Sequence, residues 1–326
     1  MSEMMNAVVA DGVGGPEVLS LGQVDRPEPA PDQVLIKVAA AGVNGPDLVQ
    51  RRGHYPPPKG SSPLLGLEVS GEVVATGQGQ SRWKVGDTVC ALTNGGGYAD
   101  FVAVKADHCL PIPQGIDPID AAGLCETYFT VWSNVFHGHD LPSGSLFLVH
   151  GGAGGIGSTA TQLGAAFGLR VFTTVDGAEA AAFAQRLGAE RAIDFRNEDF
   201  VPIVREAGGS NVTLDIIGGD YIARNIKAAR HDGRIIQLAF NHGSKIEIDL
   251  MPVMLKRLSL TGSTLRTRPD AFKSAVAAEL QEKVWPKFAT GSFRQVTDSR
   301  LPLAEASAAH TLMESGQHQG KILLLP

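Results

Sequence analysis

The chain has 326 residues, enough for two domains of the usual size of about 100–200 residues. Apolar residues make up 43% and charged residues 19%, a balance that excludes general disorder. A net charge of −6 and the absence of long basic runs argue against a nucleic-acid partner.

The three cysteines also limit what the protein can be. Cys90, Cys109 and Cys125 have no C-x-x-C spacing, so neither a disulfide framework nor a structural zinc site is expected. Sparse cysteines are typical of a reducing compartment, and no signal peptide or apolar run of about 18 residues is recognisable. We therefore expect a cytoplasmic protein without a membrane segment.

Short β-like runs separated by Gly and Pro fill the first third of the chain. Residues 33–38 alternate between apolar and polar side chains, which is typical of a half-buried strand. Further strands are expected at residues 6–10, 69–75, 88–92 and 98–104. Short strands with frequent turns predict a small antiparallel barrel or sandwich.

From about residue 120 onward, helical and apolar segments alternate. Helices are expected at residues 119–138, 158–167, 179–187, 223–229 and 269–289. Strands are expected at residues 146–149, 170–175, 191–193, 212–217, 234–240, 258–262 and 321–325. Continuous apolar strands between amphipathic helices predict a parallel sheet covered on both faces, so the whole chain has the pattern of an α/β protein.

A glycine-rich turn follows the strand at residues 146–149. Gly152, Gly154 and Gly157 match G-x-G-x-x-G, with Ala153, Gly155 and Ile156 between them, and a helix is expected to follow. Such a turn binds the pyrophosphate of a dinucleotide at a helix N-terminus. Asp176 ends the next strand, where an acid accepts hydrogen bonds from a ribose. The alternative is a turn whose glycines serve packing alone.

Several longer runs resemble a known family. They are residues 44–48 (NGPDL), 50–58 (QRRGHYPPP), 66–71 (GLEVSG), 214–219 (LDIIGG) and 320–322 (GKI), together with the glycine-rich turn. In these runs the chain resembles the quinone oxidoreductase (zeta-crystallin-like) family of zinc-free medium-chain dehydrogenases/reductases. Tyr55-Pro56-Pro57-Pro58 and Glu126-Thr127 resemble its p53-inducible quinone reductase subgroup.

The resemblance implies a fold and an activity. The fold would combine a GroES-like β-barrel domain, residues 1–122 and 268–326, with a Rossmann doubly wound parallel-sheet domain, residues 123–267. The activity would be NAD(P)H-dependent transfer of a hydride from the nicotinamide to a quinone or an α,β-unsaturated carbonyl. Members are commonly homodimers joined through an edge strand, for which residues 258–262 are the candidate.

Two residues stand at positions where zinc-using relatives have metal ligands. Zinc-using relatives carry a Cys and a His at positions resembling Asn44 and Leu67. Leu67 cannot bind a metal, and a catalytic zinc needs at least three protein ligands, so we expect a zinc-independent enzyme.

The resemblance also suggests site residues. Tyr55 is the candidate donor to the oxyanion that develops on the acceptor, and packing on the neighbouring prolines is the alternative. Asn44 could bind the nicotinamide ribose or the substrate oxygen, or be a turn residue in the left-handed conformation. The other residues expected to line the cofactor are Thr130, Phe195, Gly218, Phe240, Ser263 and Leu265.

The choice between NADH and NADPH is open. Relatives that prefer NADPH carry Ser, Lys and Tyr where this chain has Gly177, Ala180 and Phe195. Asp176 would also repel a 2′-phosphate, so the residues slightly favour NADH whereas the family default is NADPH. Arg196 or Arg266 could still bind the phosphate.

Two other functions are compatible with these motifs. The first is a dinucleotide-dependent binding protein, crystallin-like or RNA-binding. The second is an enoyl-thioester reductase, which would need a channel with basic residues at its mouth, such as Lys59, Arg51 and Arg52. We expect His150 and Cys125 to be structural.

Overall fold

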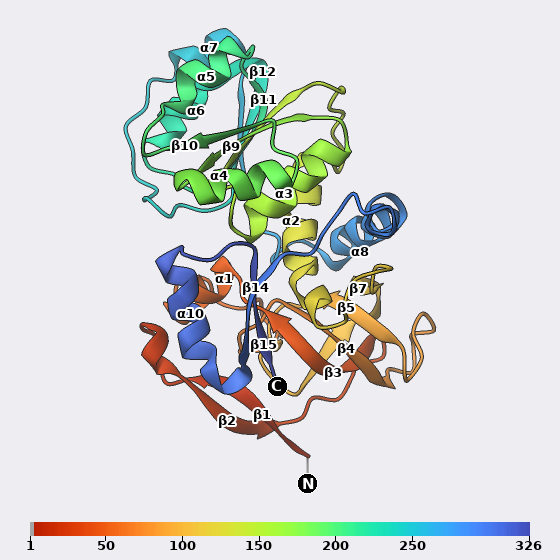
Figure 1. Ribbon diagram of the computed structural model, residues 1–326. Helices are drawn as coiled ribbons and strands as arrows, with labels where there is room; N and C mark the ends of the chain where they lie inside the picture. The colour runs from red at the N-terminus through yellow and green to blue at the C-terminus, as the bar shows by residue number, and fades with distance from the viewer. Residues whose placement is uncertain (1–2) are drawn as a thin grey trace. The chain divides into compact units, whose positions relative to one another are not determined.

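The computed structural model describes residues 3–326, and the chain divides into two compact units (Figure 1). The barrel unit contains the chain up to Phe129 and again from Arg266 to Pro326. The parallel-sheet unit is formed by Thr130–Leu265.

The barrel unit is built on a mainly antiparallel sheet. Within residues 3–326 its strand order is β14-β15-β3-β4-β5-β7, and β6 pairs with β3. These strands are β3 (Gln33–Gly42), β4 (Glu68–Thr76), β5 (Thr88–Leu92), β6 (Phe101–Lys105), β7 (Cys109–Pro111), β14 (Thr297–Pro302) and β15 (Lys321–Leu325). A separate antiparallel pair joins β1 (Met4–Ala10) to β2 (Leu19–Asp25). The C-terminal strand β15 pairs with β3, so the chain end returns to the first domain as expected.

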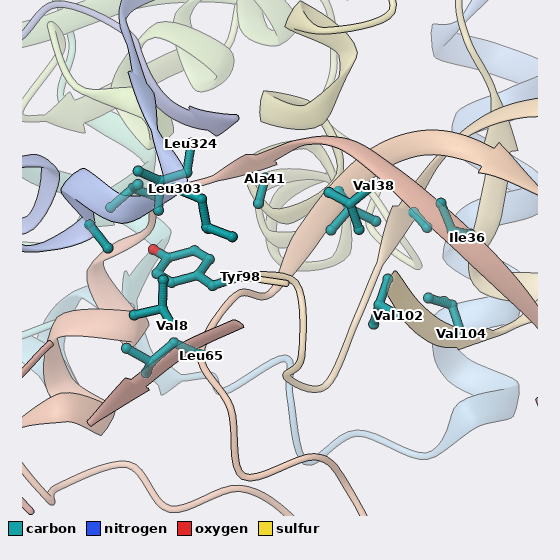
Figure 2. Close-up of a cluster of buried hydrophobic side chains, with 14 of the residues drawn as sticks. Val8, Ile36, Val38, Ala41, Leu65, Tyr98, Val102, Val104, Leu303 and Leu324 are labelled. Atoms are coloured by element: carbon teal, nitrogen blue, oxygen red, sulfur yellow. The ribbon is translucent and has the colours of Figure 1, made fainter. Parts of the chain in front are cut away.

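One apolar core joins the two ends of the chain in this unit. Alternate residues of β3, such as Ile36 and Val38, point into it, as the period of two predicts. In Figure 2, Tyr98 lies with Leu303 and Leu324, which come from the other end of the chain. The helices of this unit are α1 (Gly45–Arg51), α8 (Asp270–Glu279), α9 (Pro286–Ala289) and α10 (Ala306–Ser315).

The parallel-sheet unit has the strand order β10-β9-β8-β11-β12-β13, and all its pairings are parallel. Its strands are β8 (Leu146–His150), β9 (Arg170–Val175), β10 (Arg191–Asp194), β11 (Ser210–Asp215), β12 (Ala229–Gln237) and β13 (Ser259–Gly262). Counted along the unit, this is the 3-2-1-4-5-6 order of the Rossmann fold. The doubly wound sheet is thereby confirmed, and β8 and β11 flank its switch point.

Helices follow the strands of this sheet. They are α3 (Gly155–Ala166), α4 (Gly177–Arg186), α5 (Phe200–Glu206), α6 (Tyr221–Ala228) and α7 (Met251–Lys256), and α2 (Cys125–Val135) precedes β8 (Figure 1). Helices α3 and α4 contact β8, β9 and β10, whereas α6 and α7 contact β12. Within the described part of the chain, every helix is too short or too polar to cross a membrane.

Several expected boundaries were wrong. The strands expected to reach residues 217 and 240 end at Asp215 and Gln237. At the first of these ends, the Asp215 carboxylate accepts hydrogen bonds from the N–H groups of Ile217 (2.6 Å) and Gly218 (3.0 Å), which turns the chain out of the sheet. The helix expected over residues 269–289 is divided into α8, a π-helical turn and α9, and a proline opens α9.

Candidate active site and cofactor site

The three motif glycines of the parallel-sheet unit have different neighbours. A Cβ at Gly157 would lie 2.1 Å from the carbonyl oxygen of Gly151, and one at Gly152 would lie 2.1 Å from Thr173 Oγ1. A Cβ at Gly154 would have no neighbour nearer than 3.9 Å. Packing therefore explains Gly152 and Gly157, but it does not explain Gly154.

The open space at Gly154 lies where a phosphate cradle is expected. Gly154 is the N-cap of α3 with extended backbone (φ −76°, ψ 179°), and the helix begins at Gly155, earlier than the sequence suggested. The first N–H groups of a helix lack intrahelical partners and mark its positive end, so this terminus suits a pyrophosphate. Ala153, Gly155 and Ile156 are partly exposed along the same turn. The residues present thus fit a dinucleotide.

Asp176 and Arg196 form an ion pair at the carboxyl ends of β9 and β10. Arg196 Nη2 donates to Asp176 Oδ2 at 2.7 Å, and both side chains are at least half exposed. Phe195 beside them is 44% exposed. Ala180 is buried in an apolar cluster with Val175, so its position serves packing.

The remaining predicted cofactor residues lie at two places in this unit. Gly218 has a positive φ of 72°, and its missing Cβ leaves room for Phe240, whose ring atom Cδ1 would lie only 2.8 Å from it. Ser263 donates its N–H to Gln237 O at 3.3 Å, just past the end of β12, and Leu265 is buried.

Thr130 lies on α2 and is 9% exposed, and Thr130 Oγ1 has no hydrogen-bond partner among residues 3–326. A buried polar atom without a partner is costly, and a bound ligand is one way to satisfy it.

His150 is a structural residue of the glycine-rich turn, as expected. Its ring is fully buried and lies 2.9 Å from Thr174 Oγ1 and 2.7 Å from Asn225 Oδ1. Asn225 in turn donates to Asp215 Oδ2 at 2.8 Å. Burial lowers the pKa of His150, so the ring stays neutral. This chain of bonds connects the end of β8 to the ends of β9 and β11.

Asn44 lies in the barrel unit and is not a left-handed turn residue. Its backbone is extended (φ −135°, ψ 153°) because it is the N-cap of α1. Its amide group donates to Glu68 Oε1 at 2.9 Å and to Gly42 O at 3.2 Å, and Asn44 Oδ1 accepts from Lys321 Nζ at 2.5 Å. The side chain is therefore held inside the protein by Glu68 and Lys321, which form a fully buried ion pair of 2.7 Å.

Tyr55 is half-buried and lies against Arg266 in the same unit. The guanidinium carbon of Arg266 is 5.6 Å from the centre of the Tyr55 ring, within the range of a cation–π contact. Burial and the charge of Glu126 raise the pKa of Tyr55, so its phenol keeps its proton. Arg266 also donates to Asn94 O at 2.9 Å and to Gln50 Oε1 at 2.7 Å. These bonds hold the guanidinium group of Arg266 within the barrel unit.

A second buried chain of polar groups passes through the barrel unit. Arg51 is 2% exposed and bonds to Glu314, so it does not lie at the mouth of a channel. Arg51 Nη1 lies 3.1 Å from His310 Nδ1, and because arginine can only donate, Nδ1 must accept. The other ring nitrogen then carries the proton toward the Tyr98 hydroxyl, 3.2 Å away. Burial, with the charge of Arg51, lowers the pKa of His310 to about 3.

Within residues 3–326, no group of three His, Cys, Asp or Glu side chains is placed to hold a metal ion. Leu67 is 2% exposed and belongs to the apolar interior. All three cysteines are free and buried, and burial raises the pKa of Cys125, so this thiol is a packing residue as expected.

The sequence reasoning missed the importance of Glu68, Lys321 and Glu126. One signal was available, because Glu68 and Lys321 each stand within apolar runs, GLEVSG and GKILLL. A charge in such a run needs a buried partner, although the sequence does not say which one.

Comparison with known proteins agrees with this description. Residues 30–114 match the alcohol dehydrogenase GroES-like domain, and residues 155–282 match the model described as zinc-binding dehydrogenase. The chain is 31% identical to the quinone oxidoreductase of Rattus norvegicus over 332 residues, covering 99% of this chain and 98% of the relative. It is 30% identical to the quinone oxidoreductase of Homo sapiens over 334 residues, with the same two coverages.

Solved structures are similar over the whole chain. The Escherichia coli quinone oxidoreductase complexed with NADPH has a TM-score of 0.88 at 28% identity, and the match covers 98% of this chain and 100% of that one. A mycobacterial protein complexed with NADPH and an NAD-dependent alcohol dehydrogenase each have a TM-score of 0.87, at 29% and 27% identity, and each match covers 99% of this chain and 100% of the other. The chain therefore belongs to the quinone oxidoreductase family of medium-chain dehydrogenases/reductases.

Proposed function

We propose that the protein is a zinc-independent reductase that uses NAD(P)H to reduce a quinone or an α,β-unsaturated carbonyl. The observation that carries this proposal is the open backbone at Gly154, which no packing requirement explains and which a pyrophosphate would fill. Two of the similar structures contain NADPH and one is titled NAD-dependent, so a nicotinamide dinucleotide is the expected cofactor class.

The residues at the zinc positions support the proposed zinc independence. Leu67 offers no ligand atom, and the Asn44 side chain is already bonded to Glu68 and Lys321. Without a Lewis acid, an acceptor that is already polarised by conjugation is the easier substrate. Such an acceptor develops negative charge on its oxygen, which the Tyr55 hydroxyl would stabilise by donating a hydrogen bond.

The proposed roles of the site residues follow. Tyr55 contacts the acceptor oxygen, and Asn44 binds the nicotinamide ribose or that oxygen. The glycine-rich turn holds the pyrophosphate, and Asp176 or Arg196 contacts the adenosine ribose. Thr130, Phe195, Gly218, Phe240, Ser263 and Leu265 line the cofactor. A second copy of the chain is the proposed partner.

The test is a titration of the purified protein with NADPH and with NADH, followed by nicotinamide fluorescence. Oxidation of the bound cofactor is then measured with 1,4-benzoquinone, 9,10-phenanthrenequinone, a simple enone and an enoyl thioester. Binding with quinone or enone turnover supports the proposal. Binding without turnover favours the binding-protein alternative, and a strong preference for the thioester favours the enoyl reductase alternative. Absence of binding contradicts the proposal.

Zinc independence has its own measurement. Dialysis against a chelator is expected to leave turnover unchanged, whereas lost turnover that returns with added zinc contradicts this part of the proposal.

A further inference from the structure

The barrel unit contains a buried acid that the roles above do not use. Glu126 lies in the first turn of α2 and is 9% exposed. Its backbone N–H donates to Glu68 Oε2 at 2.8 Å, which fixes the start of the helix against a second buried carboxylate. Glu68 forms an ion pair with Lys321, whereas Glu126 lies beside Glu68 without an ion pair of its own among residues 3–326.

No hydrogen bond or ion pair within residues 3–326 occupies the carboxyl group of Glu126. The positive charges of Lys321 and Lys273 both attract this carboxyl group. The Lys321 ammonium group is paired with the Glu68 carboxylate and donates to Asn44 Oδ1 and to Val43 O. The Lys273 ammonium group donates to Asn94 Oδ1 and to Arg266 O, both at 2.8 Å. Both cations are therefore held by other groups.

The surroundings of Glu126 favour its neutral form. Burial and the negative charges of Glu68 and Asp47 outweigh the attraction of the two lysines and raise the pKa of Glu126 to about 8. A carboxyl group in this condition carries a proton at neutral pH and can release it to a base.

The charge of Glu126 also affects the pKa values of Tyr55 and Arg266. Burial raises the pKa of Tyr55, and the negative charge of Glu126 adds to this effect. Burial lowers the pKa of Arg266, and the charge of Glu126 opposes that shift. A phenol whose pKa is above its usual range of about 10 is a good hydrogen-bond donor but a poor source of protons at neutral pH. Tyr55 and Glu126 are thus suited to different tasks within one region.

We propose that Glu126 supplies the proton that the reduced acceptor takes up, while Tyr55 orients the acceptor oxygen. This inference rests on the proposed reductase function. The acceptor gains a hydride from the dihydronicotinamide, which is oxidised, and its oxygen is left as an anion. The O–H bond of the Glu126 carboxyl group then breaks, the proton forms the new O–H bond of the product, and the carboxylate regains a proton from water.

The first experiment compares wild type with E126Q at saturating cofactor and acceptor across pH. The acid must be protonated to act, so wild-type kcat is expected to fall as the pH rises through about 8. E126Q keeps the shape of the side chain and loses the acid, so kcat at pH 7 is expected to fall about 100-fold and to become independent of pH near 8. E72Q, on the exposed side of β4, is the matched control and keeps both rate and profile. An unchanged rate and pH profile in E126Q would overturn the proposal.

A second variant keeps the test decisive if E126Q does not fold. Y55F is expected to lower kcat but to retain the loss of activity near pH 8, because Glu126 is still present. Loss of that pH dependence in Y55F would assign the proton to Tyr55 and overturn the proposal.

A third measurement needs no turnover. Carbon-13 NMR of glutamate-labelled protein without cofactor is expected to show one carboxyl group titrating near pH 8, and this signal is absent in E126Q. Tyrosinate absorbance should also show Tyr55 ionising at lower pH in E126Q, because a negative charge has gone. If no carboxyl group titrates there, the inference fails while the reductase function stands. If wild type binds no dinucleotide, the proposed function fails independently of the titration.

Discussion

The ion pair of Asp176 and Arg196 presents two opposite charges at the carboxyl ends of β9 and β10. Asp176 would accept from the ribose hydroxyls of NADH and repel the phosphate of NADPH, whereas Arg196 would attract that phosphate. D176S is therefore expected to tighten NADPH binding about tenfold and to weaken NADH binding, and R196A is expected to weaken NADPH alone. Fluorescence titration measures the Kd for each cofactor.

The pair Asp232 and Arg257 supplies the control for this prediction. It is an equally exposed ion pair of the same unit that lies away from the carboxyl ends of the strands. D232S should change neither Kd. An unchanged NADPH to NADH ratio in D176S would remove Asp176 from the adenosine site.

The buried pair of Glu68 and Lys321 carries a prediction about stability. K321M leaves the Glu68 carboxylate buried without its cation, which is expected to lower the free energy of unfolding by about 3–5 kcal/mol. The double variant E68Q/K321M removes both charges and should recover part of this loss. Urea unfolding measures both changes. R257M, which breaks an exposed pair, is the control and should have no measurable effect.

If K321M proves as stable as wild type, the buried pair of Glu68 and Lys321 contributes nothing to stability and the prediction is wrong. The double-variant cycle would show this as an absence of coupling between the two positions.

Single residues also show where sequence reasoning reached its limit. The positions of Asp176 and the motif glycines in the fold were predictable because they depend on neighbours within one strand–turn–helix unit. The partners of Glu68 and Arg266 were not predictable, since they come from segments far apart in the chain that only the fold brings together. The alternative of a left-handed turn at Asn44 is excluded by a local feature, because Asn44 is the N-cap of α1 with an extended backbone.

At the scale of elements, periodicity located the regular strands well. The expected strands at Thr88–Leu92, Arg170–Val175 and Lys321–Leu325 have the boundaries that the structure gives. Helix α5 was missed because its sequence, FVPIVRE, is rich in Val, Ile and Pro. The β-branched residues among them favour strands over helices. A local signal existed, since the carboxylate of Asp199 caps its first turn by accepting from Val201 N at 3.0 Å.

The turn between β8 and α3 leads to a prediction in which two glycines of one motif respond differently. G157A places a Cβ against backbone that cannot move away, so it is expected to cost about 1–3 kcal/mol of stability. G154A meets no protein atom and should leave stability unchanged while it greatly weakens dinucleotide binding. Urea unfolding and cofactor titration separate the two effects.

Gly262 provides the control for G154A. A Cβ there would be 3.7 Å from its nearest neighbour, and the residue lies on the edge strand β13 rather than at the turn. G262A should bind cofactor as wild type does. Equal cofactor affinity in folded G154A would mean that the glycine-rich turn does not hold the pyrophosphate.

At the scale of the whole molecule, one edge of the parallel sheet has exposed backbone and apolar side chains. All four residues of β13 are exposed, and Leu260 is 40% exposed. Helix α7, which precedes β13 in the sequence, adds three apolar side chains that are each more than 60% exposed: Met251, Met254 and Leu255. An open edge strand with apolar neighbours invites pairing with another chain, so a stable monomer would have to protect it.

A homodimer in which β13 pairs with its copy would bury this edge. A two-fold axis would repeat the same surface on both protomers, so one substitution changes the interface twice. L260K/M254E is therefore expected to convert a wild-type dimer into a folded monomer in sedimentation velocity. V85E alters an exposed apolar side chain of the barrel unit and should leave the dimer intact. A wild-type monomer at all concentrations would contradict the proposal, and a dimer that survives L260K/M254E would require an interface away from β13 and α7.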